Sequence, residues 1–507
     1  MAVASATSDY PRGNGTGGGG WTGADCALLL GLVAFAALRT ASLFASPLGL
    51  GVDEAQYWLW STGFDFGYYT KPPLTSWIIG LSHGLFGHHE WAVRLPAPWL
   101  HLATSLVLWR AAHWLAGPAA GRIAAIIWMT LPSIALGSFV ISTDTPLLLC
   151  WSAGVLTLIG VLTGRLRERR GMLLAGGAFG AAMLAKYAAI YGLAGLTLFA
   201  LATIVLSCGT DRQKVIGWRG LGLFAFGMVV IASSNILWNL ANEMTTVRHL
   251  GDNANLDLRS YSLAGSIGFL AAQFATAGPV VFALMFGILR TRRGDDAGLL
   301  LLCLSAPVIL VIMVQAFLSE ANANWGLAAM PALVLWLARW MAQARPVIGR
   351  LAIGVNLALC VLVLGMTTAG SLGPLTPDSD PFRRLRGWQA LAADTGAALE
   401  AHGAATVIAD RRATASLLSW HFHDRRIGGK PVTVLVIDAD DRPSNHFEQN
   451  LAWQPVAGRR LVALDGRKAP PEMTGVDWQA GTPPLSSTAI SRNRSRDIYI
   501  HKGVEGE

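Results

Sequence analysis

Two adjacent acids, Asp53 and Glu54, are the residues of this sequence best suited to chemistry. They open the run DEAQYWLW, in which Tyr57 and two tryptophans surround them with aromatic side chains. A carboxylate within hydrogen-bond reach of a hydroxyl accepts its proton, so the pair is a candidate general base. The alternative is helix capping, because Asp and Glu favour the first turn of a helix.

Other polar residues stand at the ends of apolar segments. Asp144 begins one segment in STDTPLL, and Lys186 and Tyr187 end another in LAKYAA. An ionisable group at membrane depth costs about 2.5–3.5 kcal/mol and normally faces a cavity or a partner. We therefore expect such groups to converge on one face and bind substrate there. The residues assigned to substrate binding are Tyr57, Tyr68, Tyr69, Asp144, Tyr187, His249, Glu320, Asn324 and Trp325.

A plainer explanation stands beside each of these assignments. Asp144 is typical of a helix cap. Lys71, which precedes a proline pair, is typical of an interfacial anchor, and His249 is typical of a polar loop residue. Lys186 and Arg39 have long side chains that snorkel to the membrane surface. Scattered solvated loop residues would give a similar set, so both explanations stay open.

The elements that must position these residues are membrane helices. Of the 507 residues, 53% are hydrophobic and only 14% are charged, against about 25% charged in an ordinary soluble protein. This composition excludes a soluble protein, a disordered chain and a disulfide scaffold, and it predicts a polytopic membrane protein. Apolar stretches of about 20 residues give eleven predicted spans, near 24–45, 94–116, 119–140, 145–163, 171–189, 190–207, 217–238, 263–289, 297–318, 326–344 and 348–370.

The distribution of basic residues predicts the orientation of these helices. With a cytoplasmic N-terminus, thirteen lysines and arginines fall in inside loops and five in outside loops, as the positive-inside rule requires. The net charge of +8 is therefore a feature of topology, and we predict no nucleic-acid partner. With eleven spans, the predicted site and the C-terminal residues lie outside the cytoplasm.

The sequence divides into three predicted parts. Residues 1–23 are polar and Gly-rich and predict a disordered cytoplasmic tail without a cleaved signal peptide. Residues 24–370 form the membrane domain, whose long first loop, 46–93, contains TSWIIGLSHGLFG, a stretch too short to span and predicted to lie in the membrane interface. Residues 371–507 predict a small α/β domain, because an amphipathic helix in RRLRGWQALAADTGAALEAHG precedes the strand-like runs ATVIAD, PVTVLVIDAD and RRLVALDG.

Nothing in the sequence predicts metal, redox or nucleotide chemistry. The five cysteines lie in or beside apolar runs without a CxxC, which is typical of small buried residues. His88, His89, His101 and His113 show no ligand spacing with an acid, and no GxGxxG or P-loop spacing follows a strand. We predict no cofactor and no protein-bound metal. Assistance by an added divalent cation stays open, although no residue set supports it.

Several motifs stand in an order that resembles a known family. DEAQYWLW, GYYTKPPL, the VRLPA run from Val93, TDTPL, LAKYAA and ANWG are similar to the motifs of bacterial membrane glycosyltransferases of family 39. That family includes the protein O-mannosyltransferase-like proteins and is related to the lipid A aminoarabinose transferases. The resemblance covers roughly residues 24–345. It implies the GT-C fold, an all-α polytopic membrane protein with about eleven transmembrane helices and a small extracytoplasmic α/β C-terminal domain.

The resemblance implies an enzyme that moves a sugar, with inversion, from a polyprenyl-phosphate carrier to a lipid, glycan or protein acceptor. The implied location is the outer face of a bacterial inner membrane. Asp53 matches the catalytic acid of the first-loop DE motif, and Glu54 is its neighbour. Lys71 matches the basic residue that lies near the donor phosphate in the aminoarabinose enzymes. Those enzymes have a carboxylate, associated with a metal site, where this chain has Thr70, so a bound zinc is not expected.

The leaving phosphate of such a donor gains negative charge as the glycosidic bond breaks. Fixed cations stabilise that charge best in a low-dielectric cleft. The candidate phosphate-binding residues are Lys71, Arg39, Lys186, Arg248 and Arg259.

Two other classes of protein stay open on the sequence alone. A transporter or flippase for a lipid-linked saccharide also needs many helices, but the chain lacks paired Gly/Pro-broken segments in matching halves. A non-catalytic subunit of envelope-polysaccharide assembly would use the C-terminal domain for protein contact and would not need Asp53. The sequence names neither the sugar nor the acceptor.

Overall fold

The computed structural model describes residues 22–207, 216–254, 261–288, 295–344, 347–371, 380–438, 445–466, 470–479 and 499–506. The chain folds into two compact units. The bundle unit consists of Met1–Leu43, Lys71–Thr75 and Leu95–Gly365, and the α/β unit of Phe44–Thr70, Ser76–Arg94 and Met366–Glu507. Most of the predicted first loop therefore clusters with the C-terminal residues.

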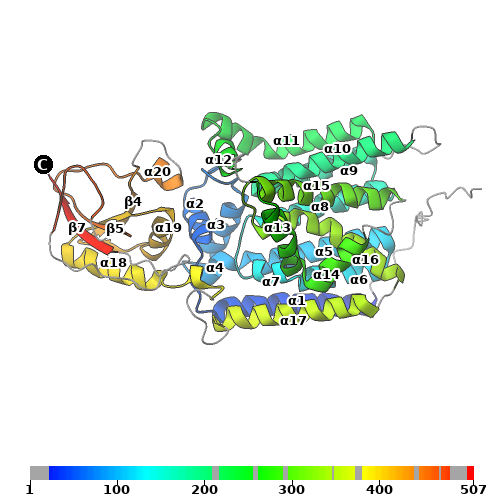
Figure 1. Ribbon diagram of the computed structural model, residues 1–507, viewed down its shortest axis with the longest axis horizontal. Helices are drawn as coiled ribbons and strands as arrows, with labels where there is room; N and C mark the ends of the chain where they lie inside the picture. Colours follow the sequence, from blue (N-terminus) through cyan, green and yellow to red (C-terminus); the bar gives the residue numbers. More distant parts are fainter. Residues whose placement is uncertain are drawn as a thin grey trace, which may run out of the picture. The chain divides into compact units, whose positions relative to one another are not determined.

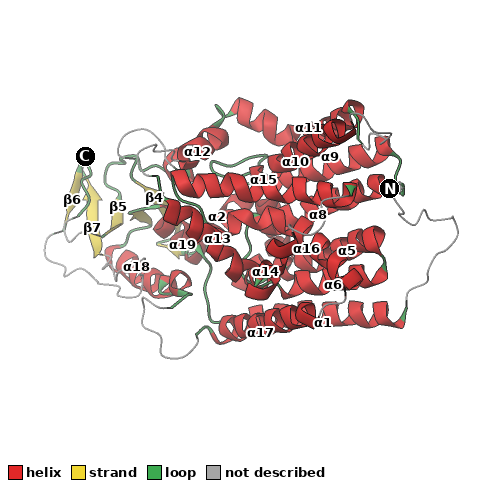
Figure 2. Ribbon diagram, turned by 45° about the vertical axis from the view of Figure 1, so that its right-hand side comes forward, coloured by secondary structure: helices red, strands yellow, loops and turns green. Residues whose placement is uncertain are grey.

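The described part of the bundle unit is helical throughout. Figure 2 shows most of its helices running side by side. The helices are α1 (Gly23–Ala45), α5 (Pro96–Ala116), α6 (Pro118–Thr130), α7 (Pro132–Gly137), α8 (Asp144–Leu162), α9 (Glu168–Ala185), η1 (Tyr187–Ala189), α10 (Ile190–Ser207), α11 (Trp218–Ala241), α12 (Thr245–Ala254), α13 (Leu263–Ala277), α14 (Pro279–Ile288), α15 (Asp296–Leu318), η2 (Ala323–Ala329), α16 (Met330–Ala344) and α17 (Val347–Ala369).

Within the described chain, seven helices are long and apolar enough to cross a membrane, or eight if one bent pair counts as a single span. The seven are α1, α8, η1 with α10, α11, α15, η2 with α16, and α17, and the bent pair is α13 with α14. The predicted spans 94–116 and 171–189 are also helical, as α5 and α9, but fall outside this set. The prediction of a polytopic helical protein is confirmed, and the number eleven stays a prediction.

The predicted span 263–289 is broken into two helices, so its prediction as one helix was wrong. α13 and α14 meet at an angle of 115°. Gly278 lies between them with φ 88°, a conformation that costs glycine little, and Pro279 cannot donate a backbone hydrogen bond. Asn356 of α17 satisfies part of the freed backbone, because its Nδ2 donates to the carbonyl of Ala277 at 2.8 Å.

The predicted span 119–140 is also broken, and its prediction as one helix was wrong. α6 ends at Thr130, and α7 begins again at Pro132. Leu131 between them is extended, with φ −63° and ψ 131°, because a residue before proline avoids the helical region. The chain turns here before it enters α8.

Close backbone contact joins the central helices α9 and α11. A side-chain carbon on Gly180 of α9 would lie 2.6 Å from the carbonyl oxygen of Met228, and one on Gly227 of α11 would lie 2.7 Å from that of Leu173. Only glycine permits these approaches, and small residues at helix interfaces are the usual means of packing helices in lipid. The C-terminal end of α9, which Lys186 follows, is thereby fixed beside α11.

The α/β unit combines first-loop helices with a C-terminal sheet. Its elements are α2 (Val52–Ser61), most of α3 (Leu74–Phe86), α4 (Glu90–Arg94), η3 (Arg383–Leu385), α18 (Trp388–His402), β1 (Thr406–Ala409), α19 (Arg412–His421), β2 (Arg426–Ile427), β3 (Lys430–Pro431), β4 (Thr433–Val436), α20 (His446–Asn450), β5 (Arg460–Asp465), β6 (Val476–Trp478) and β7 (Tyr499–Glu505). The predicted amphipathic helix is α18, and the three strand-like runs form β1, β4 and β5, so this part of the fold prediction is confirmed.

The main sheet has the order β4-β1-β5-β7-β6. β4, β1 and β5 are parallel, and β7 pairs antiparallel with both β5 and β6. Helix α19 follows β1 directly and packs against both β4 and the first-loop helix α2; Figure 1 shows α19 beside α2. This packing brings residues near 53 and near 412 together.

Candidate active site

Glu54 is tied into the backbone of the first loop by a buried ion pair. Arg94 Nε donates to Glu54 Oε1 at 2.9 Å, and Arg94 Nη2 donates to Glu54 Oε2 at 2.7 Å. The two side chains are only 1% and 2% exposed. Glu54 Oε2 also accepts from the backbone N–H of Gly51 at 2.8 Å, which closes a cap at the start of α2. Glu54 therefore makes the helix-capping contact that the sequence offered as the alternative to a catalytic role.

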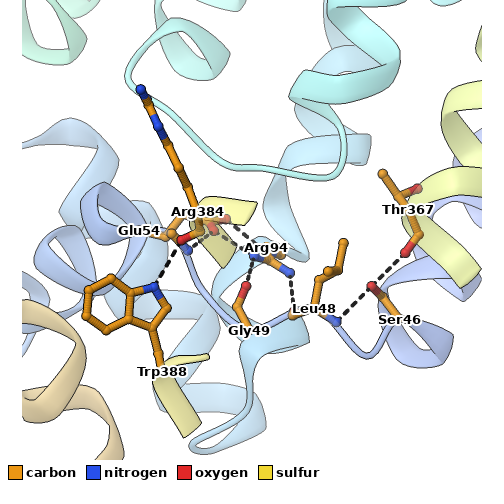
Figure 3. A network of polar contacts seen from close by, with 9 residues as sticks. Ser46, Leu48, Gly49, Glu54, Arg94, Thr367, Arg384 and Trp388 are labelled. Carbon is orange, nitrogen blue, oxygen red and sulfur yellow. Dashed lines mark hydrogen bonds and ion pairs between the residues drawn. The ribbon is translucent and has the colours of Figure 1, made fainter. Parts of the chain in front are cut away.

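Arg94 extends this network into the segment before α2. Its Nη1 and Nη2 donate to the carbonyl oxygens of Leu48 and Gly49 at 3.0 and 2.7 Å. Ser46 lengthens the chain of contacts, because its Oγ donates to the carbonyl of Thr367 at 2.7 Å. Figure 3 shows the guanidinium of Arg94 between Glu54 and these carbonyls. Every contact in the network serves to fix the N-terminus of α2.

Asp53 has a different environment from its neighbour. Its side chain is 63% exposed, and Arg412 Nη2 donates to Asp53 Oδ1 at 3.1 Å. Arg412 is the first residue of α19. One acid of the pair is thus available to a substrate, while the other is enclosed by protein.

The bundle unit brings three predicted residues together at the ends of its helices. Lys186 Nζ lies 2.7 Å from Asp144 Oδ1, and Asn324 Nδ2 donates to Asp144 Oδ2 at 2.8 Å. The residues come from the start of α8, the residue after α9 and the helix η2. Asp144 is the first residue of α8, after the N-cap residue Thr143, and its carboxylate bonds to Lys186 and Asn324. The three form one polar cluster, which we call the Asp144 cluster.

A second set of polar contacts adjoins Lys186 in the sequence. The Tyr187 hydroxyl donates to Asn235 Oδ1 at 2.7 Å and accepts from Asn239 Nδ2 at 2.9 Å. Both asparagines are buried at 3% exposure near the C-terminal end of α11. These contacts fix the turn that carries Lys186.

Arg39 is buried inside the bundle unit. Its Nη2 donates to the carbonyl of Met129 at 2.7 Å, and its Nη1 donates to Ser138 Oγ at 3.0 Å. The side chain is 3% exposed. These contacts favour a structural role in joining α1 to the α6–α7 break, and we do not carry Arg39 forward as a phosphate ligand.

Two of the predicted tyrosines are packed into the α/β unit. Tyr57 is 5% exposed, and its ring lies 5.7 Å from that of Trp60. Tyr68 stacks on Trp60 at 4.9 Å, and its hydroxyl donates to the carbonyl of Gly63 at 3.1 Å. Burial raises the pKa of Tyr68 to about 12. Their contacts support α2 and the loop after it.

The remaining predicted residues are spread over the bundle unit and the end of the first loop. Arg248 is 68% exposed and lies 3.4 Å from Glu243, and Trp325 packs beside Phe269 and Ala316. Arg259 lies outside the described residues. Glu320 is exposed, and Tyr69, Lys71 and His249 are half-buried.

Arg412 contacts Asp53, and Arg94 contacts Glu54. The sequence did not predict either contact. Arg412 lies three residues after the end of β1, beyond the carboxyl end of a parallel strand, where functional residues are common. Arg94 lies inside the VRLPA motif. Both positions were visible in the sequence, but their partners were not.

No group of three or more His, Cys, Asp or Glu side chains that could hold a metal ion occurs among the described residues. The absence of a metal from the reaction stays a prediction.

The sequence is similar to those of known proteins. Residues 70–238 match the family model described as dolichyl-phosphate-mannose-protein mannosyltransferase. The chain is 31% identical over 450 residues to the lipid A galacturonosyltransferase RgtD of Rhizobium johnstonii, covering 86% of this chain and 90% of that protein.

Solved structures show the same fold. ArnT from Cupriavidus metallidurans bound to undecaprenyl phosphate has a TM-score of 0.58 at 16% identity, covering 86% of this chain and 93% of ArnT. The arabinofuranosyltransferase AftD from mycobacteria has a TM-score of 0.51 at 15% identity, covering 94% of this chain and 40% of AftD.

The multi-pass helical fold, the match to solved structures and the likeness to RgtD together define a GT-C membrane glycosyltransferase. The chain belongs to the family 39 glycosyltransferases, together with RgtD. It is an enzyme that uses a polyprenyl-phosphate sugar as donor, and it is a multi-pass protein of the bacterial inner membrane. The transporter and assembly-subunit alternatives are not favoured.

Proposed function

We propose that this enzyme transfers a sugar from a polyprenyl phosphate to a lipid A-type glycolipid at the extracytoplasmic face of the inner membrane, with inversion at the anomeric carbon. The lipid acceptor is supported by RgtD, a lipid A galacturonosyltransferase that is similar over almost its whole length. RgtD also makes a hexuronic acid the first sugar to test. The outer face is supported by the excess of basic residues in the opposite loops.

One observation carries the proposal. Of the two adjacent first-loop acids, Glu54 is enclosed with Arg94 at 1% exposure, whereas the Asp53 carboxylate is 63% exposed. The Glu54 network fixes the start of α2, so Asp53 is held in place while remaining open to an acceptor. A fixed and accessible carboxylate is the arrangement that a general base requires.

The chemistry assigned to Asp53 is a single displacement. The acceptor oxygen attacks the anomeric carbon as Asp53 takes the hydroxyl proton, and a new glycosidic bond forms. The bond between that carbon and the phosphate oxygen breaks, and its electron pair leaves with the polyprenyl phosphate. Asp53 then returns its proton to water, so no further reactant is consumed.

We propose that Lys71 and Lys186 stabilise the negative charge of the leaving phosphate. Lys71 follows the GYYT run, and Lys186 is held at 2.7 Å from Asp144 Oδ1. Asn324 Nδ2 donates a hydrogen bond to the second carboxylate oxygen of Asp144, which keeps the cluster in one arrangement. A positive charge that is already fixed in position lowers the activation barrier of the transfer, because the protein does not have to reorganise during the reaction.

The test is a transfer assay with purified protein. Undecaprenyl-phosphate galacturonic acid and undecaprenyl-phosphate mannose would each be offered with lipid A or with a Ser/Thr-rich peptide, and the products weighed by mass spectrometry. We expect lipid A to gain one sugar residue. Glycosylation of the peptide alone would overturn the proposed acceptor, and no transfer to either acceptor would overturn the proposed reaction.

Asp65 offers a matched control in the same loop. Its Oδ1 accepts the neighbouring Phe66 N–H at 2.7 Å, a bond that asparagine also makes. Asp53→Asn should lower kcat by about 10²–10⁴-fold, the usual contribution of a general base. Asp65→Asn should leave kcat unchanged.

A further inference from the structure

Arg412 lies 359 residues from Asp53 in the sequence, yet the α/β unit brings the two side chains into contact. Helix α19 starts at Arg412 and packs against α2. We propose that Arg412 is a positioning residue that holds the Asp53 carboxylate in its reactive orientation, so that the C-terminal sheet domain takes part in catalysis. This inference rests on the proposed function of Asp53 as the base.

The guanidinium of Arg412 is anchored at two points on α2. Nη2 donates to Asp53 Oδ1 at 3.1 Å, and Nη1 donates to Gln56 Oε1. Asp53 and Gln56 are three residues apart, so they lie on the same face of the helix. Gln56 is 0% exposed, which makes it a fixed point from which Arg412 presents its other nitrogen to Asp53.

This arrangement differs from an ordinary surface ion pair. An exposed pair contributes about 0–1 kcal/mol, because two long side chains must be ordered to form it. Here the amide of Gln56 already orders the arginine. The planar fork of a guanidinium bonds to two acceptors at once, and a lysine cannot reproduce that geometry.

The placement of α19 has its own physical cause. Asp410, at the end of β1, accepts from Thr414 Oγ1 at 2.6 Å and so ties the first turn of α19 to the strand. Burial of the Asp410 carboxyl raises its pKa. The helix therefore begins at a fixed point of the sheet, and the sheet sets the position of Arg412.

A second contact region keeps α19 against the first-loop helices. Trp420 of α19 lies 4.8 Å from Trp58 of α2, ring to ring, and stacks on His88 at 3.7 Å. The His88 ring nitrogen Nε2 also lies 3.0 Å from the Trp420 carbonyl oxygen. With Arg412 at one end of the helix and Trp420 near the other, α19 is held along its length.

The experiment compares Arg412→Ala and Arg412→Lys with Arg425→Ala. Arg425 is a matched control, because it also lies in the C-terminal part of the α/β unit and pairs at 2.8 Å with an acid, Glu400, that is 63% exposed. For each variant, kcat and the KM for undecaprenyl-phosphate sugar are measured with the amount of folded protein determined by size-exclusion chromatography. Added guanidinium ion at millimolar concentration tests chemical rescue.

We expect Arg412→Ala to lower kcat by about 10- to 100-fold, the loss that follows from a base misplaced by about 1 Å, with the donor KM unchanged. Arg412→Lys should recover only part of kcat, guanidinium should partly restore Arg412→Ala, and Arg425→Ala should match the wild type. Gln56→Met, which removes the anchor but leaves both charges, should lower kcat in the same direction.

Two results separate the inference from the proposed function. A wild-type enzyme that transfers sugar while Arg412→Ala equals Arg425→Ala would overturn the role of Arg412 alone. A rise in kcat for Arg412→Ala would also overturn it, because the arginine would then restrain the base. A wild-type protein that transfers no sugar at all would overturn the proposed function, and this inference with it.

Discussion

Replacing Glu54 with glutamine should destabilise the protein, whereas the same change at Asp53 should not. Glu54 and Arg94 are 1% and 2% exposed and share two hydrogen bonds of 2.9 and 2.7 Å. Glu54→Gln leaves the guanidinium buried without a carboxylate, and breaking a buried pair in this way costs about 3–5 kcal/mol. Asp53→Asn removes only an exposed pair, for which we expect less than about 1 kcal/mol.

The measurement is the free energy of unfolding in detergent micelles by denaturant titration, with sugar transfer measured in parallel at low temperature. Glu54→Gln should unfold at clearly lower denaturant and retain transfer in the fraction that remains folded. Asp53→Asn should unfold like the wild type and be inactive. The two variants therefore separate loss of structure from loss of chemistry.

A double-mutant cycle provides the control. Combining Glu54→Gln with Arg94→Gln removes both charges, so the two single costs should not add, and the coupling should be about 2–3 kcal/mol, near the upper end for contacting residues. If Glu54→Gln unfolded within 1 kcal/mol of the wild type and yet lost transfer, the structural role of Glu54 would be refuted. Glu54 would then belong to the chemistry.

Three further predictions follow from other contacts. Lys186→Met should lower transfer more than it lowers stability, because it removes the cation assigned to the phosphate. Asp144→Asn, which removes the carboxylate that holds the Lys186 ammonium in place, should raise the donor KM because the cation is no longer positioned; steady-state kinetics check both. Asn356→Leu should cost about 1–3 kcal/mol of unfolding free energy by leaving the Ala277 carbonyl unpaired, and a denaturant titration would show no change if the bend needs no support. Burial and the nearby His423 lower the pKa of His88 to about 4, below the unfolded value of about 6.5. The unfolded chain then binds more protons between these values, so stability should be full above pH 6.5 and fall towards pH 4, and His88→Phe should flatten that pH dependence.

Most of the fold could be predicted because its signals are local. Apolar stretches of span length and the alternation of the strand runs depend on residues close together in the sequence. The break at Gly278 was missed because glycine and proline are also common inside membrane helices. The freed carbonyl of Ala277 is satisfied by Asn356, a partner 79 residues away.

The sequence singled out the members of the candidate site, but it did not show that Asp53 and Glu54 make different contacts. Asp53 and Glu54 are adjacent, and the sequence treats them alike. Their environments differ because Arg94, forty residues on, encloses Glu54, and Arg412, from the C-terminal sheet domain, reaches Asp53. Asp144, Lys186 and Asn324 were each singled out from the sequence, because polar groups at the ends of apolar segments need partners, but their contacts with one another required the structure.

The most direct test of the account is sugar transfer to lipid A by purified wild-type protein and by its Asp53→Asn variant. The donor is undecaprenyl-phosphate galacturonic acid, and the readout is the mass of the lipid product. The account predicts lipid A carrying one additional sugar with the wild type, and a rate lower by about 10²–10⁴-fold with Asp53→Asn. Equal rates for the two proteins would contradict it, because the exposed acid at the start of α2 would then not be the base.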